Sequence, residues 1–174
     1  LFPSPKENNL VIMLSGVGAR SGFSTLISDT LPDLEVIEKS QCFPLYLYEK
    51  IEREEIVVDD LFSNSEGKTN KQAYTRKDAI SNVGLTYIKA AYPKESISKE
   101  DVFYYVYGLL HSTEYRERYA DNLTKELPRI PCVNRAKDFW AFSQAGRDLA
   151  DIHINYETVD CYPVTLDKGT KRLT

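Results

Sequence analysis

Short apolar runs separated by polar loops dominate the first third of the chain. Residues 10–14 are continuously apolar and end at the glycine-rich stretch 15–22, after which a second apolar segment covers residues 23–27. Residues 34–37 are a candidate third segment. In residues 42–48 tyrosine alternates with leucine, which is the period of a half-buried strand. Closely spaced strands with short loops predict an antiparallel or mixed β-sheet, and residues 10–62 are expected to be mainly strands.

A polar stretch without periodicity follows this strand region. Residues 49–55 are strongly charged, and residues 63–71 consist mostly of serine, asparagine, glycine and lysine. Such composition is typical of surface loops, so residues 63–76 are predicted to be an exposed loop.

From residue 77 to residue 154 the apolar positions follow helical spacing. Ser98 precedes two acidic residues and is predicted to cap a helix, because its hydroxyl can accept from the first turn and acids suit the positive helix end. Thr113 is predicted to cap a second helix that runs to Leu127, and Asn134 a last one.

Strands followed by helices predict an α+β fold, with an N-terminal antiparallel or mixed sheet and a C-terminal helical cluster. At 174 residues the chain has about the length of one domain, so residues 1–174 are interpreted as a single domain. The first residue is Leu1 and not methionine, which favours a fragment or a processed chain.

The charge balance narrows the classes of function. The net charge is −4 and the isoelectric point about 5.3, which argues against a free-standing, non-specific nucleic-acid binder. It leaves open a module that reads bases while a larger neighbour holds the phosphates. The chain has no apolar run near the roughly 20 residues needed to cross a bilayer, and its three cysteines are far apart, so a cytoplasmic protein with reduced thiols is expected.

The glycine-rich stretch does not match a nucleotide-binding loop. A phosphate-binding loop needs lysine and then serine or threonine after its last glycine, but Gly22 is followed by Phe23. A β-hairpin loop is the favoured interpretation. Within it, Arg20 beside Ser21 has the fork geometry to contact a guanine edge or a phosphate, although a solvated arginine is the commoner outcome.

A second motif has the order of a metal-dependent nuclease. Asp33 follows a proline, and Glu66 is separated by one residue from Lys68, as in sites where two carboxylates bind magnesium and a lysine positions water. Glu66 falls in the predicted polar loop, which cannot hold such a site rigidly, so this function is only an alternative.

Aromatic and histidine residues of the helical region admit structural interpretations. Five of the 12 tyrosines lie between positions 104 and 119. They could stack on nucleobases, but their spacing favours rings at the edge of the core with hydroxyls that reach water or backbone. His111 near a helix end is expected to be a capping cation and His153 a core residue, so no catalytic residue and no metal ligand is assigned.

Several blocks of the sequence resemble one known family. The blocks are CFPLYLY at 42–48, DVFYYVYGLLHSTEYRERYA at 101–120, LPRIP at 127–131 and FWAFSQAGRDLA at 139–150. They are similar to the type ISP restriction enzymes, in which one polypeptide joins a nuclease, a helicase-like motor, an adenine-N6 DNA methyltransferase and a C-terminal target recognition domain. The resemblance extends from about residue 10 to residue 156 and concerns only the target recognition domain.

The resemblance implies a sequence-specific DNA recognition module that is itself non-catalytic. The expected partners are double-stranded DNA and the methyltransferase domain of the same polypeptide, with no membrane. S-adenosylmethionine, ATP and Mg²⁺ are expected to serve the parent enzyme, a DNA adenine methyltransferase and restriction endonuclease, and not this fragment. Residues 164–174 are expected to continue further, which would make the domain truncated at its C-terminal end.

The residues predicted to contact DNA are polar or basic and lie on predicted loops around the strand region: Arg20, Ser21, Lys68, Lys71 and Arg76. Residues 101–154 are assigned to the core and to docking on the methyltransferase. Two alternatives remain, a small magnesium-dependent nuclease that uses Asp33, Glu66 and Lys68, and a protein-interaction module whose helical half binds a partner helix.

Overall fold

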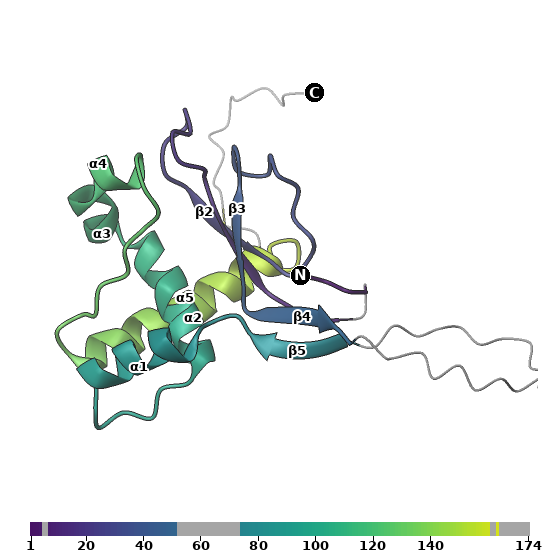
Figure 1. Cartoon of the computed structure of the whole chain (residues 1–174). Helices are drawn as coiled ribbons and strands as arrows, with labels where there is room; N and C mark the ends of the chain where they lie inside the picture. The colour runs from purple at the N-terminus through teal and green to yellow at the C-terminus, as the bar shows by residue number, and fades with distance from the viewer. Residues whose placement is uncertain (5–6, 52–73, 161–162, 164–174) are drawn as a thin grey trace, which may run out of the picture.

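The computed structural model describes residues 1–4, 7–51, 74–160 and 163 of the chain. Within these residues strands come first and helices follow, which confirms the predicted α+β class (Figure 1). No helix of the described part is both long and apolar enough to span a membrane.

Three short strands form an antiparallel sheet with β1 at its centre. β1 (Val11–Leu14) pairs with β2 (Thr25–Ser28) on one side and with β3 (Gln41–Pro44) on the other. All four residues of β1 are buried, as expected for a continuously apolar run in a central strand. The prediction of a strand at residues 34–37 is wrong, because these residues form turns before β3.

A second, two-stranded antiparallel ribbon runs across the end of this sheet (Figure 1). It consists of β4 (Tyr46–Lys50) and β5 (Tyr74–Asp78). The predicted strand at 42–48 is therefore divided into β3 and β4 at Leu45, whose side chain is buried. The prediction of a loop up to residue 76 and of a helix from residue 77 is wrong, because residues 74–78 form β5. All five residues of β5 are exposed, and their sequence shows no alternation of apolar and polar residues that would indicate a strand.

The first two helices begin at serine caps. In α1 (Asn82–Ala91) the Ser81 hydroxyl accepts from the first turn. In α2 (Lys99–His111) Ser98 and Asp101 form a reciprocal capping box, which confirms the predicted cap at Ser98.

The helix predicted to run from Thr113 to Leu127 is divided into two short helices, α3 (Thr113–Arg118) and α4 (Ala120–Leu123). The cap of α3 is Ser112, one residue before the predicted Thr113, because the Ser112 hydroxyl is the one that reaches the Tyr115 amide (3.3 Å). At the junction Tyr119 leaves helical geometry, with φ −112° and ψ 19°.

The last helix is α5 (Ala136–Ile154), and the residue at its N-terminal cap position is Arg135 and not the predicted Asn134. No side chain caps its amides. The Arg135 guanidinium pairs with Asp138 in the first turn (2.8 Å), where an acid favours the positive end of the helix.

The core lies where α2 crosses α5 beneath the sheet (Figure 1). At the crossing the two backbones touch through glycines. A Cβ atom at Gly108 would collide with the carbonyl of Phe142, and one at Gly146 with the carbonyl of Tyr104. The sequence FWAFSQAGRDLA therefore places a glycine where the helices are closest.

Three buried tyrosines fix the extended segment between α4 and α5. Their hydroxyls donate to alternate carbonyls of this segment, which confirms the prediction that tyrosine rings line the core with hydroxyls on backbone groups. The pairs are Tyr92 Oη with Val133 O (2.6 Å), Tyr105 Oη with Pro131 O (2.6 Å) and Tyr115 Oη with Arg129 O (2.8 Å).

The two histidines lie together at the end of α2. His153 Nδ1 and the Tyr107 hydroxyl are 2.5 Å apart, which confirms that His153 has a hydrogen-bond partner, although its side chain is half-buried and lies outside the core. The prediction of His111 as a capping cation is wrong. Burial, with the charges of Arg116 and His153, lowers the pKa of His111 to about 4, so the ring is neutral at pH 7.

Candidate nucleic-acid interface

Three loops meet at one end of the molecule, which we call the loop end. They are residues 15–24 between β1 and β2, residues 29–40 between β2 and β3, and residues 119–126 around α4 (Figure 1). Residues 15–24 connect the paired strands β1 and β2, whereas residues 29–40 cross from the opposite end of the sheet to the start of β3, beside Leu14.

Backbone hydrogen bonds tie the three loops to one another. The Gly16 amide donates to the Glu38 carbonyl (3.0 Å), and the Gly18 amide donates to the Thr124 carbonyl (3.1 Å). A Cβ atom at Gly16 would lie 2.7 Å from the Cβ atom of Lys39, so only glycine allows the first two loops to approach this closely. The predicted hairpin loop is confirmed, since β2 and not a helix follows Gly22.

A carboxylate joins the first two loops. Glu38 Oε1 accepts from the Arg20 amide (2.9 Å), and Oε2 accepts from the Ser21 amide (3.0 Å) and the Ser21 hydroxyl (2.9 Å). These hydrogen bonds lower the pKa of Glu38 to about 2. The carboxylate is therefore ionised at neutral pH.

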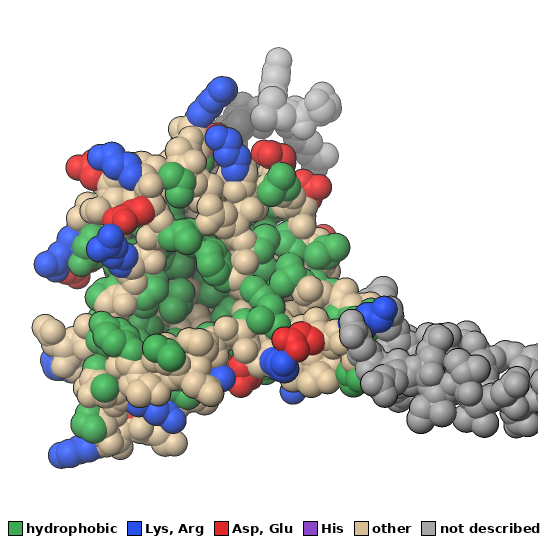
Figure 2. Space-filling model, in the orientation of Figure 1, with side chains coloured by type: hydrophobic (Ala, Val, Ile, Leu, Met, Phe, Trp, Pro, Cys, Tyr) green, Lys and Arg blue, Asp and Glu red, His purple; other side chains and the backbone are tan. Residues whose placement is uncertain are grey.

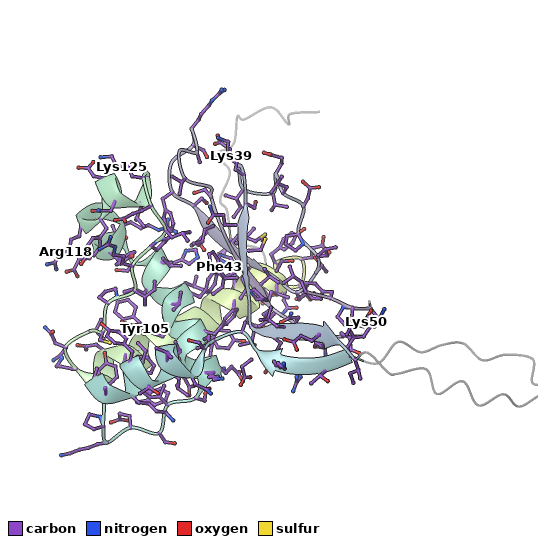
Figure 3. All side chains as sticks on the ribbon, in the orientation of Figure 1. Lys39, Phe43, Lys50, Tyr105, Arg118 and Lys125 are labelled. Atoms are coloured by element: carbon purple, nitrogen blue, oxygen red, sulfur yellow. The ribbon has the colours of Figure 1, made fainter. Side chains whose placement is uncertain are left out.

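The loop end carries three exposed cations, one from each loop. Arg20, Lys39 and Lys125 form no salt bridge with any residue in the described part of the chain. Figure 3 shows that Lys39 and Lys125 project at this end, and Figure 2 shows basic side chains over it with acidic ones among them. Nothing in the local sequence marks Lys39 or Lys125, because each stands alone on its loop and only the fold brings them beside Arg20.

The remaining predicted DNA contacts do not join this group. Arg76 lies on β5 and not on the predicted loop, with its guanidinium 4.3 Å from the centre of the Tyr46 ring. Lys68 and Lys71 lie outside the described residues. The structure therefore brings together Arg20 and Ser21, and it places Arg76 on the ribbon at a different end of the molecule (Figure 1).

The nuclease alternative gains no support from the described residues. Asp33 lies in an exposed turn, where its Oδ1 accepts from the Glu35 amide (2.9 Å), and not on a rigid strand. Glu66 and Lys68 lie outside the described part. Within that part no group of three or more histidine, cysteine, aspartate or glutamate side chains is placed to hold a metal ion.

An apolar groove of about 440 Å³ opens on the face seen in Figure 2, between β3, α2 and the segment before α5. Phe43, Leu47 and Leu127 line it and remain 42%, 42% and 46% exposed. No local sequence pattern predicts this groove, because its walls come from separate segments between residues 12 and 130 that meet only in the folded chain. The other lining residues are Ile12, Leu14, Pro44, Ala79, Ile80, Phe103, Val106, Leu110, Pro128 and Ile130.

Comparisons with known proteins place these features in context. The profile of the type ISP C-terminal specificity domain matches residues 1–172. No curated protein sequence matches the chain. Among solved structures, a DrdV–DNA complex determined by cryo-electron microscopy superposes with a TM-score of 0.73 and 37% identity, over 93% of this chain and 14% of that one.

Two further solved structures show the same relationship. The ATP-dependent type ISP restriction–modification enzyme LlaBIII, bound to DNA, has a TM-score of 0.69 and 33% identity over 96% of this chain and 9% of its own. A nuclease-deletion mutant of the type ISP enzyme LlaGI, in complex with a DNA substrate mimic, has a TM-score of 0.63 and 35% identity over 93% of this chain and 12% of its own. The chain thus spans less than a sixth of the length of each structure.

Proposed function

The chain belongs to the family of type ISP C-terminal specificity domains, and we propose that it recognises a specific sequence of double-stranded DNA as part of a longer restriction–modification polypeptide. The observation that carries this proposal is the loop end, where three tied loops present three unpaired cations. The solved relatives were all determined with DNA.

Within this proposal the loop end reads bases and does not supply the main electrostatic attraction. A net charge of −4 repels a polyanion, so most phosphate contacts must come from the rest of the longer polypeptide. The forked guanidinium of Arg20 suits a guanine edge in the major groove, while Lys39 and Lys125 suit flanking phosphates. Lys68 and Lys71 remain proposed contacts, as does Arg76 on β5.

The proposal gives this chain no chemical step of its own. The S-adenosylmethionine, ATP and Mg²⁺ that the family resemblance implies are assigned to the other parts of the longer polypeptide, which would methylate adenine and cleave DNA. A reader of this kind needs a shaped, hydrogen-bonding surface and no reactive centre.

Substitutions at Arg20 in the full-length polypeptide test the base-reading role. Arg20→Lys keeps the charge but loses the fork, so discrimination at one base position is expected to fall by about 1–3 kcal/mol while the salt dependence of binding is unchanged. The measurement is the sequence pattern of methylated adenines in genomic DNA, together with binding to duplex DNA at several salt concentrations. An unaltered pattern for both Arg20→Lys and Arg20→Ala would refute the role.

A matched pair of lysines tests the orientation of the domain. Lys39→Ala at the loop end is expected to weaken binding to all sequences equally and to lower the salt slope by about 1. Lys94→Ala makes the same change at an exposed site between α1 and α2, away from the loop end, and is expected to change neither quantity. Equal effects of the two substitutions would place the DNA elsewhere.

We also propose that the apolar groove receives the methyltransferase domain of the same polypeptide. Its exposed Phe43, Leu47 and Leu127 form one continuous apolar surface, and such surfaces mark contacts with another protein. The solved relatives have chains more than six times as long as the part that this chain covers, so a neighbouring domain is available to cover it.

Leu127→Asp in the full-length polypeptide tests this docking. Because Leu127 is 46% exposed, the domain alone is expected to keep its stability, while in the full-length protein it unfolds at a lower temperature and becomes more sensitive to limited proteolysis. Val83→Asp, on the 80% exposed face of α1, is the matched control and is expected to have no effect. Indistinguishable unfolding of both variants would exclude the groove as the docking site.

A further inference from the structure

The carboxylate of Glu38 occupies every exposed hydrogen-bond donor of the Arg20–Ser21 turn apart from the guanidinium. Both oxygens are used, one by the Arg20 amide and the other by the Ser21 amide and hydroxyl. The backbone amides of this turn are therefore closed to a phosphate. Any hydrogen bond that the turn donates to a nucleic-acid ligand must therefore come from the Arg20 side chain.

Glu38 is itself held in an unusual conformation. Its φ is +23° and that of Lys39 is +57°, a region that residues other than glycine rarely adopt. The surrounding contacts impose it, since the Glu38 carbonyl accepts from Gly16 and the Ser40 hydroxyl accepts from the Ile37 amide (2.9 Å). The carboxylate is thus presented to the turn by a fixed backbone and does not swing on a free loop.

A negative charge at this place works against simple attraction for DNA. It lies on the same loop as Asp33 and Glu35, and it adjoins the two cations Arg20 and Lys39. A surface built only to attract phosphate would gain from its removal. The three hydrogen bonds give another benefit, because they fix the backbone from which the Arg20 side chain projects and so reduce the freedom that binding must remove.

We propose that Glu38 is a positioning residue for DNA recognition, whose clasp on the Arg20–Ser21 turn sets the direction of the Arg20 guanidinium and thereby the sequence preference. This inference rests on the proposed function of the loop end. It assigns sequence discrimination in part to a residue that does not itself contact a base.

The test compares Glu38→Gln with Glu35→Gln in the full-length polypeptide. Both remove one negative charge from the same loop, but only the first breaks the clasp, since an amide nitrogen replaces one of the two accepting oxygens. The carboxylate of Glu35 forms no hydrogen bond or salt bridge within the described part of the chain, and only its amide is bonded, to Asp33 Oδ1. The probe is a duplex DNA library with a randomised central stretch, and the bound fraction and its sequences are measured separately at two salt concentrations.

The two readouts separate charge from positioning. Both variants are expected to retain more total DNA at low salt, because each lacks a repelling charge. Glu38→Gln alone is expected to lower the enrichment of the preferred sequence by about two- to tenfold, the range expected when one side chain must be ordered on binding. Glu38→Asp, which keeps the charge on a shorter stem, is expected to restore part of the preference.

Each outcome decides the matter. If Glu38→Gln and Glu35→Gln give the same enrichment, the positioning role is overturned. If Arg20→Ala lowers the enrichment and Glu38→Gln does not, the positioning role of Glu38 is refuted and the proposed function stands. If Arg20→Ala also leaves the enrichment unchanged, the proposed function of the loop end is refuted. Should Glu38→Gln not fold, Ser21→Ala removes one bond of the clasp and is expected to give a smaller loss, whereas an unchanged enrichment there overturns the inference.

Discussion

The crossing of α2 over α5 makes the sharpest prediction about stability. Gly108→Ala would place a methyl group against the Phe142 carbonyl and 3.0 Å from the Gly146 amide nitrogen. Both are backbone atoms of α5 that cannot rotate away, so the helices must separate by on the order of 1 Å. Overpacking of this kind costs about 3 kcal/mol, at the upper end of the usual range, and the better helix propensity of alanine returns about 1 kcal/mol. The expected net loss is about 2 kcal/mol of unfolding free energy.

Gly84→Ala in α1 is the matched control. Its methyl group would meet only the Ser81 hydroxyl oxygen at 3.4 Å and an Ile80 methyl at 4.0 Å, which are ordinary contacts. We expect this variant to be unchanged or stabilised by up to about 1 kcal/mol. Urea unfolding, followed by the fluorescence of the single tryptophan, Trp140 on α5, reports both variants. Gly108→Ala as stable as Gly84→Ala would refute the account of the crossing.

Three further predictions concern the core and its titrating groups. Tyr105→Phe leaves the Pro131 carbonyl without its donor and is expected to cost about 1–2 kcal/mol in urea unfolding. Burial raises the pKa of Asp101, but hydrogen bonds from Ser98 and Arg147 outweigh this effect and lower the pKa below 3.8. The stability that this group contributes is therefore present above pH 3.8 and is lost on further acidification. Arg147→Met is expected to reduce this acid-induced loss of stability, measured as the unfolding free energy at several pH values. The pKa of His111 is lowered to about 4, so between pH 6.5 and pH 4 this side chain binds fewer protons in the folded chain than in the unfolded chain and destabilises the fold. The difference in unfolding free energy between His111→Leu and the native chain is therefore expected to favour the variant more at pH 5 than at pH 8.

Local signals predicted the parts of the fold that local physics determines. The capping box at Ser98 needs only residues three positions apart, and the apolar run of β1 identifies a buried central strand by itself. β5 escaped prediction because its backbone hydrogen bonds come from β4, more than 20 residues earlier, and its exposed side chains need no apolar alternation. His111 was misassigned because its charge depends on burial and on Arg116, neither of which its position near a helix end reveals.

The candidate site was less predictable than the fold because its components are loops that touch only in three dimensions. Arg20 could be singled out, since an arginine among glycines is locally unusual, but its partner Glu38 is 18 residues away on another loop. Lys125 follows 105 residues after Arg20 and lies at the same end, where the carbonyl of the preceding Thr124 accepts from the Gly18 amide. Sequence alone therefore predicts Arg20 and Ser21 and not the residues from the other two loops that lie beside them.

The separation of the rigid core from the loop end has a consequence for how such a domain can change its target. The α2–α5 crossing and the tyrosine-held segment fix the core through glycines and backbone carbonyls that lie outside the loop end. The loop end is joined to the core by the β1 register, by a few backbone hydrogen bonds and by the packing of Phe23, Tyr119 and Leu123. Gly16 cannot be replaced without moving Lys39. Exposed loop side chains can then vary without loss of the fold, provided that the glycine approach and a carboxylate clasp persist. If this holds, exchange of residues 29–40 between relatives should transfer sequence preference only when residues 16–22 are exchanged with them, because each clasp fits its own turn. Transfer of preference by residues 29–40 alone would mean that the two loops read DNA independently.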